Sequence, residues 1–130
     1  MLDQVLATTS SDDERLFYLG SALEGLRQTF FRQTMFAEFE LAIHRLVEKG
    51  EALSGQRLTA IYAELVRRYH GHDQGVCVVD DLHTHEWAYI PHFYYNYYVY
   101  QYATSLAASS LFAREVLDGV EGARDRYLDV

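Results

Sequence analysis

The sequence predicts an all-α protein, and three observations lead to this prediction. Apolar residues recur at spacings of three and four through most of the 130 residues, which is the period of one helical face. Serines stand before these stretches and glycines follow them, as is typical of helix ends. The valine-rich run Val76 to Val79 is the exception, and it could form a lone strand or an extended plug. A single strand cannot make a sheet, so the class remains all-α.

The first helical stretch is expected to begin just after Ser11. Ser11 and Glu14 have the spacing of a capping box, in which each side chain accepts a hydrogen bond from a backbone N–H at the start of the helix. The stretch from about 12 to 49 is predicted to be one long helix or two helices with a bend near Gly25, because glycine weakens a helix interior. Gly50 is expected to end it. Its periodic apolar face consists of Leu16, Leu19, Leu23, Leu26, Phe30, Phe36, Phe39, Ile43 and Leu46.

A second, amphipathic helix is predicted between Ser54, which can cap its first turn, and Gly71, which can stop it. Loop character follows over residues 72–81. Cys77 lies there between valines and is expected to be a small buried apolar residue rather than a nucleophile. The apolar stripe of the helix consists of Leu58, Ile61, Tyr62, Leu65 and Tyr69.

Three further helices complete the prediction. A short helix is expected over residues 82–89, and Pro91 interrupts it. An aromatic-rich helix then runs from just after Pro91 to about Gly119, and a short C-terminal helix covers residues 120–127. No linker divides the chain, so residues 1–130 are interpreted as a single helical segment.

The overall charge excludes one class of partner. The formal net charge is -8 and the sequence pI is about 5.1, so the chain would repel a phosphate backbone, and nucleic acid is not expected as a partner. The sole cysteine, Cys77, cannot form a disulfide within the chain, which suits a reducing compartment. With neither a signal peptide nor a long apolar run, we expect a cytoplasmic protein that does not enter the membrane.

The six histidines suggest a metal site but do not complete one. His85 and Glu86 begin like the zinc-binding H-E-x-x-H helix, yet the fifth position is Tyr89 instead of histidine. That motif needs both imidazoles on one helical face. A zinc site within the chain would have to combine His83, His85, Glu86 and His92, for which the spacing gives little support. The simpler interpretation is that the loop histidines are solvated.

The most unusual feature is the tyrosine content after Pro91. Six of the nine residues from 94 to 102 are tyrosine. On a helix starting just after Pro91, one face carries the imidazole and phenol groups of His92, Tyr95 and Tyr102, with Tyr98 beside them. Such donors suit an oxyanion or a peptide carbonyl. The alternative is an aromatic helix that fills a core, with its hydroxyls bonded to water or backbone.

Two blocks of this sequence resemble a known family. Residues 31–41 (FRQTMFAEFEL) and 86–100 (EWAYIPHFYYNYYVY) closely resemble the C-terminal part of oligoendopeptidase F, a group of M3 family zinc metallopeptidases. The resemblance extends from about Leu16 to Tyr127. It implies an almost wholly helical catalytic domain that cleaves short peptides in a deep cleft.

The resemblance also implies where the metal chemistry would be found. In this family zinc is held by two histidines of an H-E-x-x-H helix and by a glutamate on a following helix, and the motif glutamate acts as base. Those residues would lie upstream of Met1, so the chain is expected to be a segment truncated at both ends. Zinc is therefore expected in the full-length enzyme and not in this segment, which would be inactive alone.

The substrate side of the family site is the part that carries over to this chain. In related M3 peptidases a histidine, followed by two tyrosines seven residues apart, binds substrate and the tetrahedral oxyanion. This pattern assigns catalytic roles to His92, Tyr95 and Tyr102, with His92, Tyr95, Tyr98 and Tyr100 as substrate-binding residues. A different alignment of the tyrosine cluster favours Tyr100 over Tyr102.

Two functional hypotheses follow. The first is a C-terminal piece of an oligoendopeptidase F-like zinc metalloendopeptidase that acts on oligopeptides. The second is a free-standing helical module that binds peptides or assembles without catalysis. Apolar helices that lack their packing partner would make a severed piece self-associate, whereas an independent module would stay monomeric.

Overall fold

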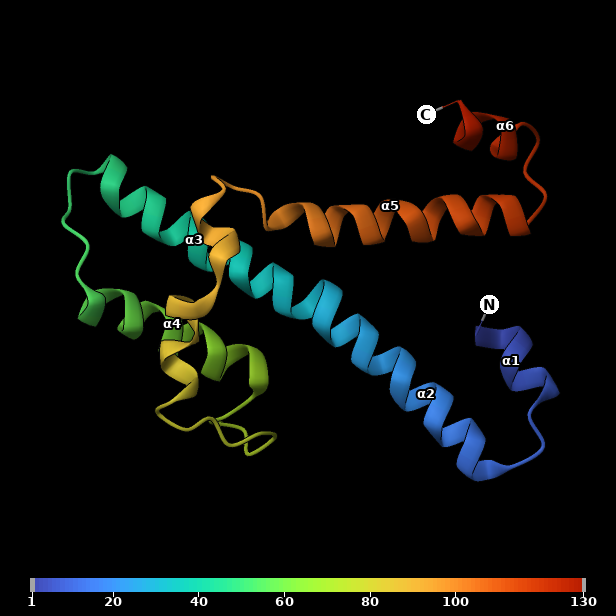
Figure 1. The fold of residues 1–130 in the computed structure, drawn as a ribbon, viewed down its shortest axis with the longest axis horizontal. Helices are drawn as coiled ribbons and strands as arrows, with labels where there is room; N and C mark the ends of the chain where they lie inside the picture. The colour runs from blue at the N-terminus through green and yellow to red at the C-terminus, as the bar shows by residue number, and fades with distance from the viewer. Residues whose placement is uncertain (1, 130) are drawn as a thin grey trace. The chain divides into compact units, whose positions relative to one another are not determined.

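The computed structural model describes residues 2–129, and every regular element in that range is helical (Figure 1). The all-α prediction is confirmed. The end residues of the predicted segment 1–130, Met1 and Val130, lie outside the described residues. The elements are α1 (Leu2–Thr8), α2 (Asp12–Leu26), the π-helical turn η1 (Arg27–Phe31), α3 (Arg32–Glu48), α4 (Gly55–His70), the 3₁₀ helices η2 (His83–Tyr89) and η3 (Pro91–Tyr94), α5 (Tyr100–Leu117) and α6 (Ala123–Leu128).

The chain forms two compact units. Residues 33–101, here called the core unit, hold almost all of α3 together with α4, η2 and η3. Residues 2–32 and 102–129, here called the terminal unit, hold α1, α2, α6 and most of α5. None of the helices described between residues 2 and 129 has the length and apolar character to cross a membrane.

The long helical stretch predicted near the N-terminus is present. Helical structure continues without interruption from Asp12 to Glu48, and its irregularity is the π-helical turn η1, which begins two residues after Gly25. Ser11 occupies the N-cap position, but its side chain makes no capping hydrogen bond, so the predicted capping box is wrong in that detail. Gly50, with φ of 77°, follows the helix as predicted. Helix α1 was not predicted.

Helix α4 matches its prediction closely because its ends are encoded locally. The Ser54 hydroxyl accepts a hydrogen bond from the Arg57 N–H at 3.2 Å, and Gly71 ends the helix in the left-handed conformation with φ of 63°. The predicted apolar stripe faces the core. Tyr62 and Leu65 are buried, and the other three stripe residues are partly buried against them.

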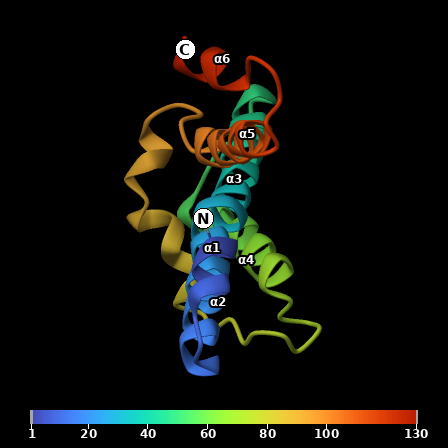
Figure 2. The same cartoon turned by 90° about the vertical axis from the view of Figure 1, so that its right-hand side faces the viewer.

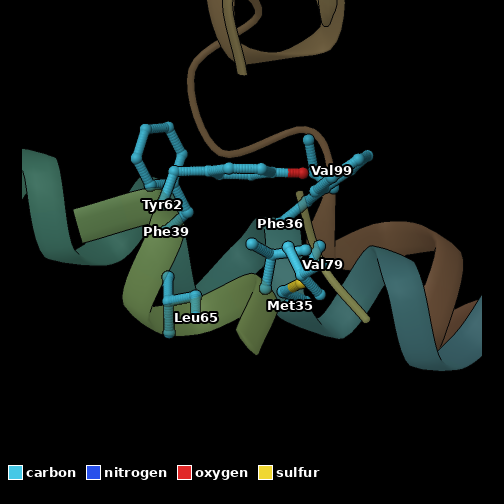
Figure 3. Packing of buried hydrophobic residues seen from close by; sticks show 8 residues of the cluster. Met35, Phe36, Phe39, Tyr62, Leu65, Val79 and Val99 are labelled. Carbon is cyan, nitrogen blue, oxygen red and sulfur yellow. The ribbon is translucent and has the colours of Figure 1, made fainter. Parts of the chain in front are cut away.

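The core lies between α3 and α4, whose buried side chains form one apolar cluster. Helix α4 lies below α3 in Figure 1 and slants away from it in Figure 2. Phe39 on α3 packs edge-on against Tyr62 on α4 with ring centroids 5.2 Å apart, and it contacts Phe93 of η3 at 5.2 Å. Val79 and Val99 bring two loops into the same cluster (Figure 3). These contacts hold η2 and η3, the gold segment of Figure 2, alongside the two helices.

Two loop predictions need correction. The valine-rich run forms no strand within the described residues, and of its side chains only Val79 is buried, while Val76, Cys77 and Val78 are exposed. The prediction of a buried Cys77 is therefore wrong. The aromatic-rich helix is also shorter than predicted, because α5 begins at Tyr100 and not just after Pro91.

Candidate functional site

The tyrosine-rich segment changes direction before α5 begins. Pro91 starts η3, where its fixed φ suits a first helical position, but η3 lasts only four residues. Asn96 and Tyr97 then adopt φ of 45° and 58°. Asparagine tolerates this left-handed conformation, whereas a bulky residue such as tyrosine seldom adopts it. The two residues form a corner that separates η3 from α5, and we call it the Asn96–Tyr97 corner.

A buried acid holds this corner in place. Glu40 on α3 is 1% exposed, and its Oε1 accepts a hydrogen bond from the Tyr97 N–H at 2.7 Å. The Tyr97 ring packs on His44, one helical turn further along α3, with centroids 4.3 Å apart. On the other side of the corner Val99 is fully buried in the core. Contacts from α3 thus compensate for the unusual backbone of Tyr97.

The corner brings three of the predicted site residues together. The rings of His92 and Tyr98 are stacked, with centroids 5.9 Å apart and an interplanar angle of 15°. Tyr95 meets Tyr98 edge-on at 6.0 Å. Phe93, beside His92, packs on Phe36 in the core at 5.4 Å. An imidazole and two phenols therefore form one cluster, anchored to the core through Phe93.

The geometry differs from the predicted helical face. His92, Tyr95 and Tyr102 were expected on one side of a continuous helix, but the Asn96–Tyr97 corner interrupts that helix, and Val99, just before α5, is buried in the core. Tyr98 is the residue that meets both His92 and Tyr95. Their functional roles stay predictions.

The two remaining tyrosines lie beyond the corner. Tyr100 is the first residue of α5, is half-exposed, and lines a cavity together with Tyr69 and Tyr97. Tyr102 is partly buried and belongs to the terminal unit. The choice between these two as the second catalytic tyrosine stays open.

The histidine-rich loops do not assemble a metal site. Within residues 2–129, no three histidine, cysteine, aspartate or glutamate side chains are grouped so that they could hold a metal ion. His83 is paired with Asp80 at 2.8 Å, and the hydrogen bond from the His83 backbone N–H lowers the pKa of that carboxyl. Glu86 accepts a hydrogen bond from the Tyr62 hydroxyl at 2.5 Å. The residues of the rearranged zinc site therefore do not fit the ligand set of a zinc ion.

The acid and the corner that shape this cluster were not predicted from the sequence. A glutamate on a periodic helix gives no sign that it is buried, so Glu40 was indistinguishable from Glu38. The Asn96–Tyr97 corner did carry a signal, because asparagine is enriched at left-handed positions. The density of aromatic residues around it favoured a continuous helix instead.

The described fold is all-helical, and its cluster combines one imidazole with two phenols. The sequence pattern described as "Peptidase family M3" matches residues 1–130. The chain belongs to this family, and its resemblance to oligoendopeptidase F is confirmed.

Named relatives give the same result. The chain is 44% identical to the oligopeptidase PepF of Bacillus subtilis over 127 residues, which is 98% of this chain and 18% of that protein. It is 40% identical over 131 residues to the group B oligopeptidase PepB of Streptococcus agalactiae, covering 99% of this chain and 21% of PepB. The crystal structure of oligoendopeptidase-F from Enterococcus faecium matches with a TM-score of 0.86 and 37% identity, over 98% of this chain and 24% of that one. The chain thus spans about a fifth of the length of the curated relatives it matches.

Proposed function

We propose that this chain forms the substrate-binding side of an oligoendopeptidase F-like M3 peptidase that hydrolyses short peptides. The observation that carries the proposal is the cluster of His92, Tyr95 and Tyr98, which presents an imidazole and two phenols at one place. The family membership and the relatives' names support a peptide as the substrate.

Hydrogen bonding is the chemistry that these side chains can supply. A peptide offers carbonyl groups along its backbone, and its hydrolysis passes through a tetrahedral oxyanion. Phenol and imidazole N–H or O–H groups donate to both, and one donor placed at the oxyanion contributes about 2.7–4 kcal/mol to catalysis. We assign substrate binding to His92, Tyr95, Tyr98 and Tyr100. We assign transition-state contacts to His92, Tyr95 and Tyr102, with Tyr100 as the alternative to Tyr102.

Zinc would supply an activated water and a Lewis acid in such a peptidase. The described residues do not fit a zinc site, so within this proposal the ligands and the base belong to other residues of an M3 enzyme, and the 130-residue chain by itself does not hydrolyse peptides. As part of the same proposal we place the protein in the cytoplasm, where its one cysteine would stay reduced.

A non-catalytic assembly module is the second candidate. It is favoured by the core unit, whose eight buried apolar side chains form a cluster of their own. The apolar face of α2 favours the first candidate instead, because Leu16 is 68% exposed and Leu23 is 67% exposed, and exposed apolar stripes of this kind mark surfaces that pack on other protein. Light scattering distinguishes the candidates, because a stable monomer favours an independent module and concentration-dependent association favours a segment that needs a partner.

A chimera tests the peptidase proposal directly. The segment of Bacillus subtilis oligopeptidase PepF that matches this chain is replaced by residues 1–130, and hydrolysis of an oligopeptide is measured. We expect an active chimera in which Tyr102→Phe lowers kcat by about a hundredfold or more, with a much smaller change in KM. If the alternative alignment holds, Tyr100→Phe gives this result instead.

Tyr94→Phe is the matched control, since Tyr94 lies in the same segment but is 82% exposed and has no assigned role. Its kcat is expected to stay unchanged. The proposal is wrong if kcat is retained in the His92→Ala, Tyr100→Phe and Tyr102→Phe chimeras alike. If the chimera does not fold, the same substitutions at the aligned positions of intact PepF provide the answer.

A further inference from the structure

Glu40 is a buried acid without a cationic partner. Its side chain is 1% exposed, and Oε1 accepts a single hydrogen bond, from the Tyr97 N–H. No lysine, arginine or histidine within residues 2–129 forms an ion pair with it. Oε2 accepts no hydrogen bond from the described part of the chain, and it is not among the fully buried polar atoms that lack a partner, so it remains accessible at the edge of the buried side chain.

This arrangement is costly unless something else compensates for the charge. Buried carboxylates are normally paired with a cation or coordinated by several donors, because removing the charge from water is unfavourable. One backbone N–H satisfies only one of the two oxygens. Oε2 is therefore open to a second donor, and a cation is the donor that suits a carboxylate best.

The space for such a donor is present next to Glu40. A cavity of about 390 Å³ adjoins it, and all residues that line this cavity belong to the core unit. Its lining combines the Glu40 carboxyl with three aromatic rings and with apolar side chains of α3. The residues concerned are Ala37, Leu41, Tyr69, Tyr97 and Tyr100. Tyrosine ring faces attract cations, so rings and carboxyl favour the same kind of ligand.

The other acid of this cavity is already paired. Glu38 forms an ion pair with Arg68 and accepts a hydrogen bond from the Tyr69 hydroxyl at 2.9 Å. The Arg68 hydrogen bond lowers the pKa of Glu38. Glu38 is 41% exposed at its side chain, unlike the buried Glu40. Glu40 is therefore the acid available to a ligand, and Glu38 is a natural control.

We propose that this cavity binds a primary ammonium group, with Glu40 as its counter-charge and the rings of Tyr97 and Tyr100 as its walls. The inference rests on the proposed function, because a peptide substrate carries this group at its N-terminus and on lysine side chains. Since Tyr97 also forms the Asn96–Tyr97 corner, an occupied cavity would anchor one basic end of a peptide near the cluster of His92, Tyr95 and Tyr98.

Titration of the intact chain at pH 7.5 tests the proposal. The readouts are the NMR signals of the Glu40 carboxyl carbon and the Tyr97 amide. n-Butylammonium is compared with n-butanol, which has the same chain but no charge. Glycyl-glycinamide then presents an N-terminal ammonium and Nα-acetyl-lysinamide presents a side-chain ammonium, so these two probes distinguish the sources. We expect saturable shifts with n-butylammonium and none with n-butanol.

Glu40→Gln removes the charge and keeps an acceptor for the Tyr97 N–H. It is expected to weaken ammonium binding by at least about thirtyfold, whereas Glu38→Gln changes it by less than about threefold. Equal shifts with n-butylammonium and n-butanol would overturn the proposal, as would unchanged binding by the Glu40→Gln chain. If that variant does not fold, the comparison of charged and neutral probes on the unaltered chain decides the question.

The two proposals can fail separately. Suppose that the chimera is active, that tyrosine substitutions lower its kcat, and that the chain does not bind the ammonium probes. This result would contradict only the proposed ammonium site. Conversely, suppose that ammonium binding depends on Glu40 while the kcat of the chimera is unaffected by those substitutions. That result would contradict only the proposed peptidase role.

Discussion

The two compact units are built from similar helices and differ in what these helices bury. The core unit buries a cluster of eight apolar side chains from α3, α4 and two loops. In the terminal unit, the only buried side chain among the described residues is Ala123. Both units contain apolar residues at helical spacing. Periodicity therefore predicts which face of a helix is apolar, but not whether anything covers it.

The contrast is clearest along the continuous helical stretch from α2 to α3. On α3, Phe36 and Phe39 are at most 2% exposed because α4 and η3 pack against them. On α2, Leu16 and Leu23 continue the same periodic face but are more than 60% exposed. We expect the apolar face of α2 to pack on further protein.

The largest expected effect comes from removing a core ring. Phe39→Ala should destabilise the core unit by about 3–5 kcal/mol, since Phe39 is 1% exposed and contacts both Tyr62 and Phe93. Urea unfolding followed by the fluorescence of Trp87, the chain's one tryptophan, reports this unit directly, because its ring lies 6.5 Å from that of Phe39.

Leu23→Ala is the matched change on the exposed face of α2. It should alter the free energy of unfolding of the monomeric chain by less than about 0.5 kcal/mol, as measured by circular dichroism in urea at low protein concentration. If Leu23→Ala lowered the free energy of unfolding as much as Phe39→Ala does, the two units would not differ in how far their apolar side chains are buried.

A pair of glycine substitutions should act in opposite directions. Gly71→Ala places a methyl group 3.0 Å from the Val76 side chain at a residue whose φ is 63°, and it should cost about 1–2 kcal/mol. Gly20→Ala, in the interior of α2 with no atom within 4 Å of the new methyl group, should stabilise by about 0.5–1 kcal/mol. Urea midpoints of the two variants measure both effects. Destabilisation by Gly20→Ala would mean that this face of α2 is covered.

The smallest expected effect is a pH dependence confined to the core unit. The Arg68 hydrogen bond lowers the pKa of Glu38 below its usual 4.5. A carboxyl whose pKa is lower in the folded state stabilises the fold above pH 4.5, and this contribution is lost as the pH falls through the folded value. Glu38→Gln should lower this pH-dependent stabilisation by at most about 1 kcal/mol, because the Glu38–Arg68 pair is half-exposed.

Glu24 on α2 is the counterpart in the terminal unit. Its pKa is lowered to about 2 by the Arg27 hydrogen bond, but the pair is exposed to solvent, so Glu24→Gln should leave the urea midpoint unchanged between pH 7 and 3. If Glu24→Gln flattens the pH profile as much as Glu38→Gln does, the assignment of the effect to the core unit is wrong.

The comparison also explains which parts of the structure were predictable. Helix α4 was predicted with both ends because Ser54 and Gly71 act on their own neighbours in the chain. The candidate site was predicted by residue type through the family resemblance, yet the arrangement of His92, Tyr95 and Tyr98 was not. It depends on the hydrogen bond from Tyr97 to Glu40, which are 57 residues apart.

The sequence by itself determined the all-α class, most helix boundaries, the apolar faces and the membership of peptidase family M3. These follow from backbone hydrogen bonds and spacings within a few residues, or from residue identities compared directly with relatives. Only the tertiary structure decided which apolar faces are buried, where the aromatic segment leaves the helical conformation, and that Glu40 rather than Glu38 is enclosed. Those outcomes depend on packing between segments far apart in the chain, where a left-handed tyrosine or a buried acid is retained because α3 supplies the compensating contacts.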